Sequence, residues 1–215
     1  MLGSDRIEPA LLTNGLGEDW LGSNASFKAF PACRWMHTAL ESFQNLRDGH
    51  VFQPHEIDRI VVRSSSGMLR DFMDFAPANM VDAQFSLPFA LSVLAHGDRV
   101  AADWYSPITM KDSEVLSFSQ RVAAEIDLEF DAEMSSDKRR PAGQALVAAR
   151  GQLFEGPRIF YPLGTAQRPL AKERILLKFR DNAASRLGIQ PAQSLEKAIM
   201  DIGDVDDVAE HLKLL

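Results

Sequence analysis

The segment from residue 28 to residue 37 carries more reactive side chains than any other stretch of its length. It reads Lys-Ala-Phe-Pro-Ala-Cys-Arg-Trp-Met-His. Pro31 fixes its own φ and biases Phe30 toward an extended backbone, so a helix can begin just after it. Such a helix would place Arg34 near its first turn, where free N–H groups and the helix dipole favour an anion. The segment therefore predicts a carboxylate-binding corner between an extended approach and a helix.

His37 is the candidate proton donor or acceptor of this segment. It follows Cys33 by four positions and precedes Glu41 by four, so the three side chains share one face of the predicted helix. A His–Glu pair on such a face can tune a proton donor for neutral pH. A histidine among apolar neighbours is as often a satisfied structural residue, and both alternatives stay open. A metal site built on Cys33 and His37 lacks further ligands nearby, so no metal is expected.

Composition limits the classes of function. The chain has 215 residues, of which 46% are hydrophobic, and this is enough for a real core. A net charge of −7 argues against a general affinity for nucleic acid or anionic membranes. Cys33 is the single cysteine, which excludes an intramolecular disulfide. No basic segment followed by an apolar one begins the chain, and we expect a cytoplasmic protein.

The first half of the chain predicts three helices and one strand. Apolar residues at helical spacing predict a helix over residues 34–48, which ends at Gly49. The predicted strand is the β-branched run 57–63, and the further helices cover residues 78–96 and 113–122. Pro88 either kinks the helix over 78–96 or lies in the first turn of a helix capped by Ser86.

A β-hairpin is predicted in the second half. Residues 124–133 alternate strictly, with Ile126, Leu128 and Phe130 on one face and five carboxylates on the other. Side chains two apart on a strand fan out along one face, so the acidic stripe indicates a solvated edge rather than a metal site. The apolar run 145–154 is the predicted returning strand.

The remaining sequence is helical, which favours an α+β fold: a small mixed domain with an antiparallel hairpin, followed by a helical segment. The predicted helix covers residues 170–188, and shorter helical patterns start near Ser194 and Asp204. No Gly-rich turn joins a strand to a helix, so no dinucleotide or phosphate loop is predicted. The predicted organisation is an irregular lead-in over 1–27, an α+β domain over 28–156, a connector over 157–169 and a helical segment over 170–215.

Four stretches of the sequence resemble the MmgE/PrpD family, which includes 2-methylcitrate dehydratase, cis-aconitate decarboxylase and an iminodisuccinate epimerase. They are residues 28–37, Ala-Gln-Phe-Ser-Leu-Pro-Phe at 83–89, Tyr-Pro-Leu-Gly at 161–164 and Lys-Phe-Arg-Asp-Asn-Ala-Ala at 178–184. The resemblance runs from about Leu16 to the C-terminus. It implies that the chain corresponds to the C-terminal half of the family pattern, where a small α+β domain precedes helices that return to a large all-α domain. We expect the N-terminal helical part to be absent here.

The resemblance also implies an activity and its residues. Lys28 matches a lysine of the family motif and is the first choice for the carboxylate-binding cation, with a solvated surface lysine as the alternative. Lys28 and His37 are therefore the expected catalytic residues. The expected substrate-binding residues are Cys33, Arg34, Gln84 and Ser86. Some family members carry histidine at the position of Cys33, so the exact reaction stays open.

The expected function is that of a lyase acting on a small di- or tricarboxylic acid, most simply a dehydratase, without an organic cofactor or a metal. Epimerisation or decarboxylation within the family is one alternative. A non-catalytic remnant or interaction subunit is the other. The expected partners are a second copy of the chain in a homodimer or a complementary N-terminal helical chain, with no nucleic acid and no membrane. No role is assigned to the remaining histidines, which are His50, His55, His96 and His211.

Overall fold

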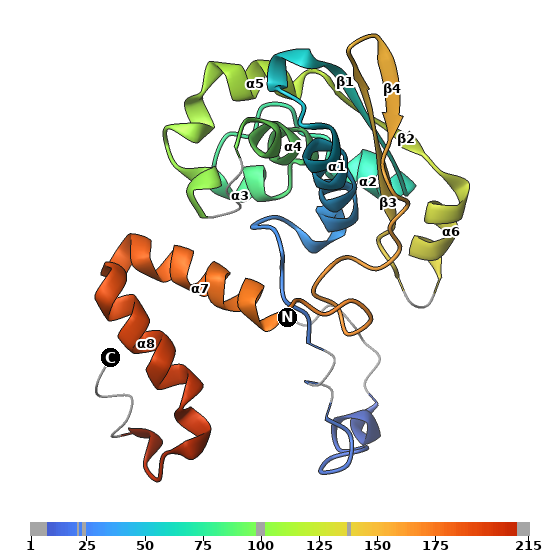
Figure 1. Cartoon of the computed structure of the whole chain (residues 1–215). Helices are drawn as coiled ribbons and strands as arrows, with labels where there is room; N and C mark the ends of the chain where they lie inside the picture. The colour runs from blue at the N-terminus through green and yellow to red at the C-terminus, as the bar shows by residue number, and fades with distance from the viewer. Residues whose placement is uncertain (1–7, 21, 23–24, 98–101, 137–138, 210–215) are drawn as a thin grey trace.

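The computed structural model describes residues 8–20, 22, 25–97, 102–136 and 139–209. Figure 1 shows a mixed domain around one sheet and a separate pair of C-terminal helices. The α-helices are α1 (His37–His50), α2 (Ser66–Asp71), α3 (Met80–Gln84), α4 (Leu87–His96), α5 (Ser113–Ser119), α6 (Leu128–Ser135), α7 (Lys172–Leu187) and α8 (Ile189–Met200). The strands are β1 (Ile57–Ser64), β2 (Val122–Ile126), β3 (Gly143–Ala149) and β4 (Gln152–Glu155). Short 3-10 helices cover Pro9–Leu12, Arg34–Met36, Pro54–Glu56, Ala102–Tyr105, Thr109–Lys111 and Ile202–Asp204.

The sheet is mixed, with the strand order β2-β1-β3-β4. The strand β1 lies in the middle, parallel to β2 and antiparallel to β3, while β3 and β4 form a hairpin. Two residues, Arg150 and Gly151, turn this hairpin, and both have a positive φ (53° and 69°). This is the backbone that a two-residue turn matching the twist of its strands requires. The predicted fold class, an α+β domain with an antiparallel hairpin and a helical C-terminal segment, is confirmed.

The core lies between the sheet and the helices α1 and α4, which cover one side of it in Figure 1. Helix α1 contacts both β3 and α4, and α4 contacts α5. Helix α4 is largely apolar and is buried from Leu87 to Ala95, as expected of a helix that lies between other elements. Its central residues and those of α1, β1 and β3 are fully buried, among them Leu40, Phe43, Ile60, Phe89, Leu91 and Val147. This packing fixes the N-terminal end of α1, where the candidate site lies.

The helix predicted over residues 78–96 is two helices. Asn79 caps α3 by accepting hydrogen bonds from the backbone N–H groups of Val81 and Asp82. Ser86 caps α4 by accepting one from Phe89 N at 3.0 Å, and Pro88 lies in the first turn. Of the two alternatives for Pro88, the structure therefore has the capped first turn, where the missing N–H costs nothing.

The strand predicted over residues 124–133 is wrong beyond Ile126. The carboxylate of Asp127 accepts hydrogen bonds from the backbone N–H groups of Glu129 and Phe130, and so starts α6. Phe130 is buried, whereas Leu128 is 83% exposed, so the alternating pattern does not describe a sheet face. The predicted hairpin partner is also wrong, because β3 pairs with β4 and β1 while β2 pairs with β1.

Helix α1 differs slightly from its prediction. A 3-10 turn over Arg34–Met36 precedes it, and it continues past Gly49 to His50, where Val51 adopts the left-handed conformation (φ 52°). Helix α5 stops at Ser119, earlier than predicted, because Val122 begins the parallel strand β2.

The helices α7 and α8 form a hairpin that lies apart from the sheet in Figure 1. They contact one another, and Arg180 of α7 pairs with Glu196 of α8 through two hydrogen bonds of 2.6 Å. No residue of α7 is buried. Helix α8 begins at Ile189, earlier than the predicted start near Ser194, and Gly188 (φ 84°) makes the turn between the two helices. None of the described helices is long and apolar enough to cross a bilayer.

Replacing Asp127 tests its role as the start of α6. Asp127→Ala should lower the free energy of unfolding by about 1 kcal/mol, because two N–H groups of α6 lose their acceptor. The matched control is Glu129→Ala, which removes another carboxylate partner of Arg158 and leaves the cap intact. The control should cost less than about 0.5 kcal/mol, as an exposed ion pair does. Urea denaturation of the two variants measures the difference, and equal losses would contradict the capping role.

Candidate functional site

The backbone from Phe27 to Cys33 leads into α1 through bends over residues 29–32, and it is held at both ends. Phe27 N donates to Gly164 O at 2.9 Å, which joins this segment to the connector after β4. Cys33 N donates to Gln84 O at 2.8 Å, at the end of α3. In Figure 1 this blue segment meets the orange connector just before α1. The structure therefore brings two predicted site residues, Cys33 and Gln84, into contact through their backbones.

Two side chains hold the middle of the same segment. The hydroxyl of Tyr105 donates to Pro31 O, and burial raises the pKa of Tyr105, so this hydroxyl keeps its proton. Lys178 Nζ, on α7, donates to Lys28 O at 2.6 Å. The carbonyl groups around the predicted catalytic lysine are thus fixed by residues that lie far away in the sequence.

Gly164 is required for the approach of the connector. Its φ is +91°, and a Cβ at this position would lie 2.1 Å from the carbonyl oxygen of Phe27. Both the backbone conformation and the space are therefore open to glycine alone. Through this glycine, the connector motif Tyr-Pro-Leu-Gly positions residues 27–33, which include Lys28.

Arg34 ties the lead-in segment, the connector and the helix together. Its Nη1 donates to Phe27 O at 3.2 Å and to Leu163 O at 3.1 Å, and lies 3.3 Å from His37 Nδ1. Its Nη2 is buried and has no hydrogen-bond acceptor within the described part of the chain. Burial lowers the pKa of Arg34, and the carboxylate of Glu41 opposes that shift. The guanidinium of Arg34 is therefore held in place by two backbone carbonyls.

His37 is neutral and has both ring nitrogens engaged. Its Nε2 lies 3.3 Å from Ala32 O, and since a carbonyl only accepts, Nε2 carries the proton. Nδ1 then accepts from Arg34. Burial, followed by the charge of Arg34, lowers the pKa of His37 to about 3, and the charges of Lys28 and Lys178 add to this shift. In this geometry the imidazole orients its neighbours and has no free nitrogen for proton transfer.

Glu41 does not pair with His37, although the two lie one helical turn apart. Its carboxylate accepts from Leu163 N at 3.0 Å and from Arg168 Nη2 at 2.5 Å. Glu41 is almost fully buried, so this ion pair with a hydrogen bond satisfies a charge that would otherwise be costly. The consequence is that the acidic side chain nearest to Arg34 is already neutralised by another arginine.

Lys28, Arg34 and Lys178 form a group of positive charges around His37, which we call the cation cluster. Lys28 is exposed. Burial lowers the pKa of Lys178, and the charge of Lys28 lowers it further. All three cations act on the imidazole of His37. A surplus of positive charge at one place in an acidic chain is a site that an anion would occupy favourably.

The other predicted substrate-binding residues differ in exposure. Cys33 and Gln84 are half-buried. Ser86 is fully buried, and its hydroxyl donates to Asp74 O at 2.5 Å while it caps α4. The hydroxyl of Ser86 thus has a structural task, and its predicted contact with substrate stays a prediction. Among the described residues, no group of three or more His, Cys, Asp or Glu side chains could hold a metal ion.

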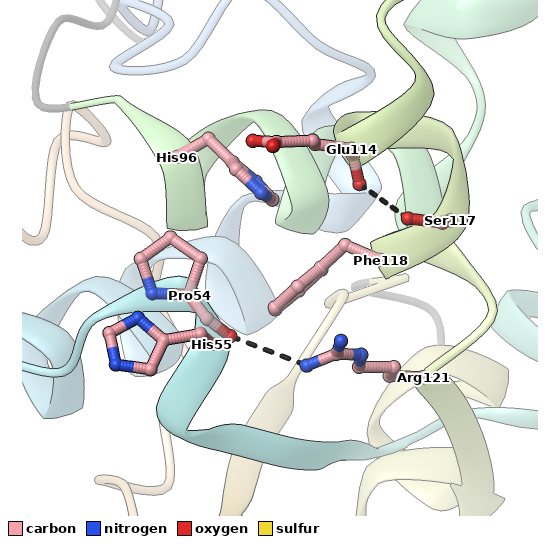
Figure 2. A pocket seen from close by; sticks show the side chains of 7 residues that line it. All are labelled: Pro54, His55, His96, Glu114, Ser117, Phe118 and Arg121. Carbon is pink, nitrogen blue, oxygen red and sulfur yellow. Dashed lines mark hydrogen bonds between the residues drawn. The ribbon is translucent and has the colours of Figure 1, made fainter.

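A separate cavity of about 400 Å³ lies beyond the C-terminal ends of α1 and α4. Figure 2 shows the side chains that line it, with the rings of His96 and Phe118 near its centre and Arg121 at one wall. Arg121 Nη1 donates to Ile57 O at 2.7 Å, and His96 Nδ1 donates to Ser92 O at 2.8 Å. The Arg121 bond joins this wall to the start of β1, whereas the His96 bond lies within α4. The cation cluster lies near the N-terminal end of α1, away from this cavity.

Three residues of the site escaped the sequence reasoning, although two of them lie inside the motifs quoted for the family resemblance. Gly164 ends the connector motif, and the Pro-x-Gly pattern signals a turn there. Lys178 begins the last motif and received no role. Arg168, the partner of Glu41, carries no signal in the sequence, because the two lie 127 positions apart.

A family model described as the MmgE/PrpD C-terminal domain matches residues 30–203. The chain belongs to the MmgE/PrpD family. The match confirms the predicted family and covers most of the chain, including Arg34, His37 and Lys178. It begins two residues after Lys28. No curated protein matches the chain significantly. In this MmgE/PrpD domain, the cation cluster therefore lies where the matched region meets the lead-in segment.

Gly164→Ala tests the close approach of the connector. Gly151 provides the matched control, because it also has a positive φ (69°) but nothing within 4 Å of an added Cβ. We expect Gly151→Ala to cost about 1 kcal/mol of unfolding free energy, the cost of left-handed backbone alone. Gly164→Ala should cost at least twice as much, since the added carbon collides with Phe27 O. Chemical denaturation measures both, and equal losses would show that the connector can move away without strain.

The lowered pKa of His37 predicts a pH dependence of stability. Below pH 6.5 the unfolded imidazole binds a proton, whereas the folded one stays neutral down to about pH 3, so stability is complete above 6.5 and falls as pH decreases. Between pH 7 and pH 5 this group should remove about 2 kcal/mol of unfolding free energy. His37→Gln should show a flatter dependence than the wild type over this range. Identical pH profiles in urea denaturation would contradict a buried neutral His37.

Proposed function

We propose that this domain binds a small di- or tricarboxylate at the cation cluster and serves as the carboxylate-binding part of a lyase of the MmgE/PrpD type. The observation that supports the proposal is the convergence of Lys28, Arg34 and Lys178 on one place, with Glu41 already paired to Arg168. A ligand with several carboxylates would replace mutual repulsion by attraction. Family membership favours the same class of ligand.

The proposed reaction is a dehydration. A general base removes a proton from a carbon next to a carboxylate, and the electron pair of the broken C–H bond forms the new double bond. The C–O bond of the neighbouring carbon breaks, and the hydroxyl leaves as water with a proton from a general acid. Negative charge builds up on the carboxylate oxygens in the transition state, and cations fixed around them stabilise it more than the ground state. Lys28 is the exposed cation that we assign to this carboxylate. The proposed reaction involves no organic cofactor and no metal.

We assign His37 the task of a positioning residue in this proposal. Its two hydrogen bonds hold the backbone of Ala32 and the side chain of Arg34. They thereby fix the C-terminal end of residues 27–33. The acid and base of the reaction then come from a helical domain that acts together with this one, as the family pattern implies. We propose that a complementary helical chain supplies this domain and completes the site. Association of two copies of the present chain is the alternative arrangement.

The α7–α8 hairpin supports a partner of this kind. Several apolar side chains of this hairpin and its turn are exposed, including Leu177 (56%), Leu187, Ile189, Ile199 and Met200. Large apolar side chains exposed in number on one element favour an interaction with another protein surface. The same observation favours the second candidate function, an interaction subunit without its own catalysis. Epimerisation and decarboxylation would use the same cations to stabilise negative charge on the carboxylate oxygens. The three reactions differ in the step that follows the formation of this charge.

Lys28→Ala tests the proposed carboxylate contact. Its affinity for citrate or 2-methylcitrate should fall roughly ten- to a hundredfold, because a charge-assisted contact is lost. The free energy of unfolding should change by less than about 0.5 kcal/mol, since Lys28 is exposed. Lys172→Ala, another exposed lysine at the start of α7, is the matched control and should bind like the wild type. Isothermal titration calorimetry measures affinity, and unchanged binding by Lys28→Ala would contradict the proposed function.

A further inference from the structure

Lys178 connects α7 to the backbone of the predicted catalytic segment. Its ammonium lies 2.6 Å from Lys28 O and uses one of its three N–H donors there. Helix α7 has no buried residue of its own. The side chain of Lys178 reaches from this helix to residues 27–33, which precede α1. Within the described residues, the hydrogen-bonded contact of this ammonium is limited to Lys28 O, so its other two donors can serve a further acceptor beside Lys28.

In the part of the chain that the structure describes, the charge that acts on Lys178 is positive. Lys28 and Lys178 repel one another, and Arg34 adds a third positive charge to the field at His37. Arg180, two positions further along α7, is compensated by Glu196, and Glu41 is compensated by Arg168. Holding the two lysines close together therefore costs electrostatic free energy. An anion bound between them would reduce their repulsion.

We propose that Lys178 is a ligand-binding residue of this site and that it couples α7 to the charge of the ligand. One carboxylate of a di- or tricarboxylate binds Lys28 and a second binds Lys178. The bound ligand thereby holds α7 against residues 27–33. This inference rests on the proposed function and adds a residue, a charge requirement and a conformational consequence to it.

The charge requirement follows from the number of cations. A monocarboxylate can neutralise one of the two lysines and leaves the other repelled by its neighbours. A ligand with two or three carboxylates neutralises both, so each additional carboxylate should raise the affinity roughly tenfold at low salt. Citrate should therefore bind more tightly than succinate, and succinate more tightly than butyrate, with differences that shrink as salt is added.

The conformational consequence concerns the exchange of backbone amides in α7. Without a buried face, this helix is kept in place by few interactions, and its amides should exchange readily. A ligand that binds Lys178 and Lys28 together should slow the exchange of residues 172–187. Butyrate should have little effect, because it does not connect the two lysines.

Three substitutions of Lys178 separate its charge from its hydrogen bond to Lys28 O. Lys178→Ala removes both, Lys178→Gln keeps a donor without the charge, and Lys178→Arg keeps the charge. We expect Lys178→Ala and Lys178→Gln to weaken citrate binding at least tenfold and to reduce the preference for citrate over butyrate. Lys178→Arg should retain most of the affinity for citrate. Lys172→Ala should match the wild type. Calorimetry measures the affinities, and hydrogen exchange with citrate should protect α7 in the wild type and in Lys178→Arg only.

The results also distinguish this inference from the proposed function. If Lys178→Gln binds citrate like the wild type while Lys28→Ala does not, Lys178 merely supports the backbone, and the inference is overturned while the proposed function stands. The same holds if citrate binds at the expected strength but leaves the exchange of α7 unchanged. If neither lysine affects citrate binding, or the wild type binds no citrate, both the inference and the proposed function fail.

Discussion

The bent backbone from Phe27 to Cys33 pairs with no strand in the part of the chain that the structure describes, so its peptide groups must find their partners elsewhere. Buried backbone N–H and C=O groups are almost always hydrogen-bonded, and here the partners come from the connector, α3, Tyr105 and α7. Four parts of the chain converge on seven residues for this reason. The position of the cation cluster follows from the same bonds, because Lys28 is the second residue of the segment and Lys178 donates to its carbonyl oxygen.

Local signals in the sequence predicted much of the fold. The Ser-Leu-Pro pattern at 86–88 contains the cap and the first-turn proline of α4, and the spacing of apolar residues predicted α1 and α7. The strand predicted over residues 124–133 is wrong beyond Ile126 because the alternation of apolar and polar residues was preferred to a helix start in the same stretch. Asp127 followed by acidic residues is typical of a helix N-terminus, and this signal was outweighed by the alternation of apolar residues.

The site could be predicted only in part, because its chemistry depends on tertiary contacts. The types and spacing of Lys28, Arg34 and His37 indicated the segment. The tautomer and low pKa of His37 follow from burial and from Arg34 and Ala32 on either side of its ring, which helical spacing does not reveal. Spacing favoured Glu41 as the partner of His37, whereas an arginine from the distant connector has taken that carboxylate. Sequence patterns indicate which residues are available, and the pairing among them is decided by the fold.

The hydrogen bond from Phe27 N to Gly164 O has a consequence for how the domain can be joined to other polypeptide. The backbone passes this point just before α1 and again after β4, so the intervening 136 positions begin and end side by side. A unit with adjacent ends can be inserted into a loop of a larger protein, or be rejoined as a circular permutant, without stretching either connection. Modular exchange of this mixed α+β unit between helical scaffolds therefore requires only that a scaffold present two neighbouring chain ends.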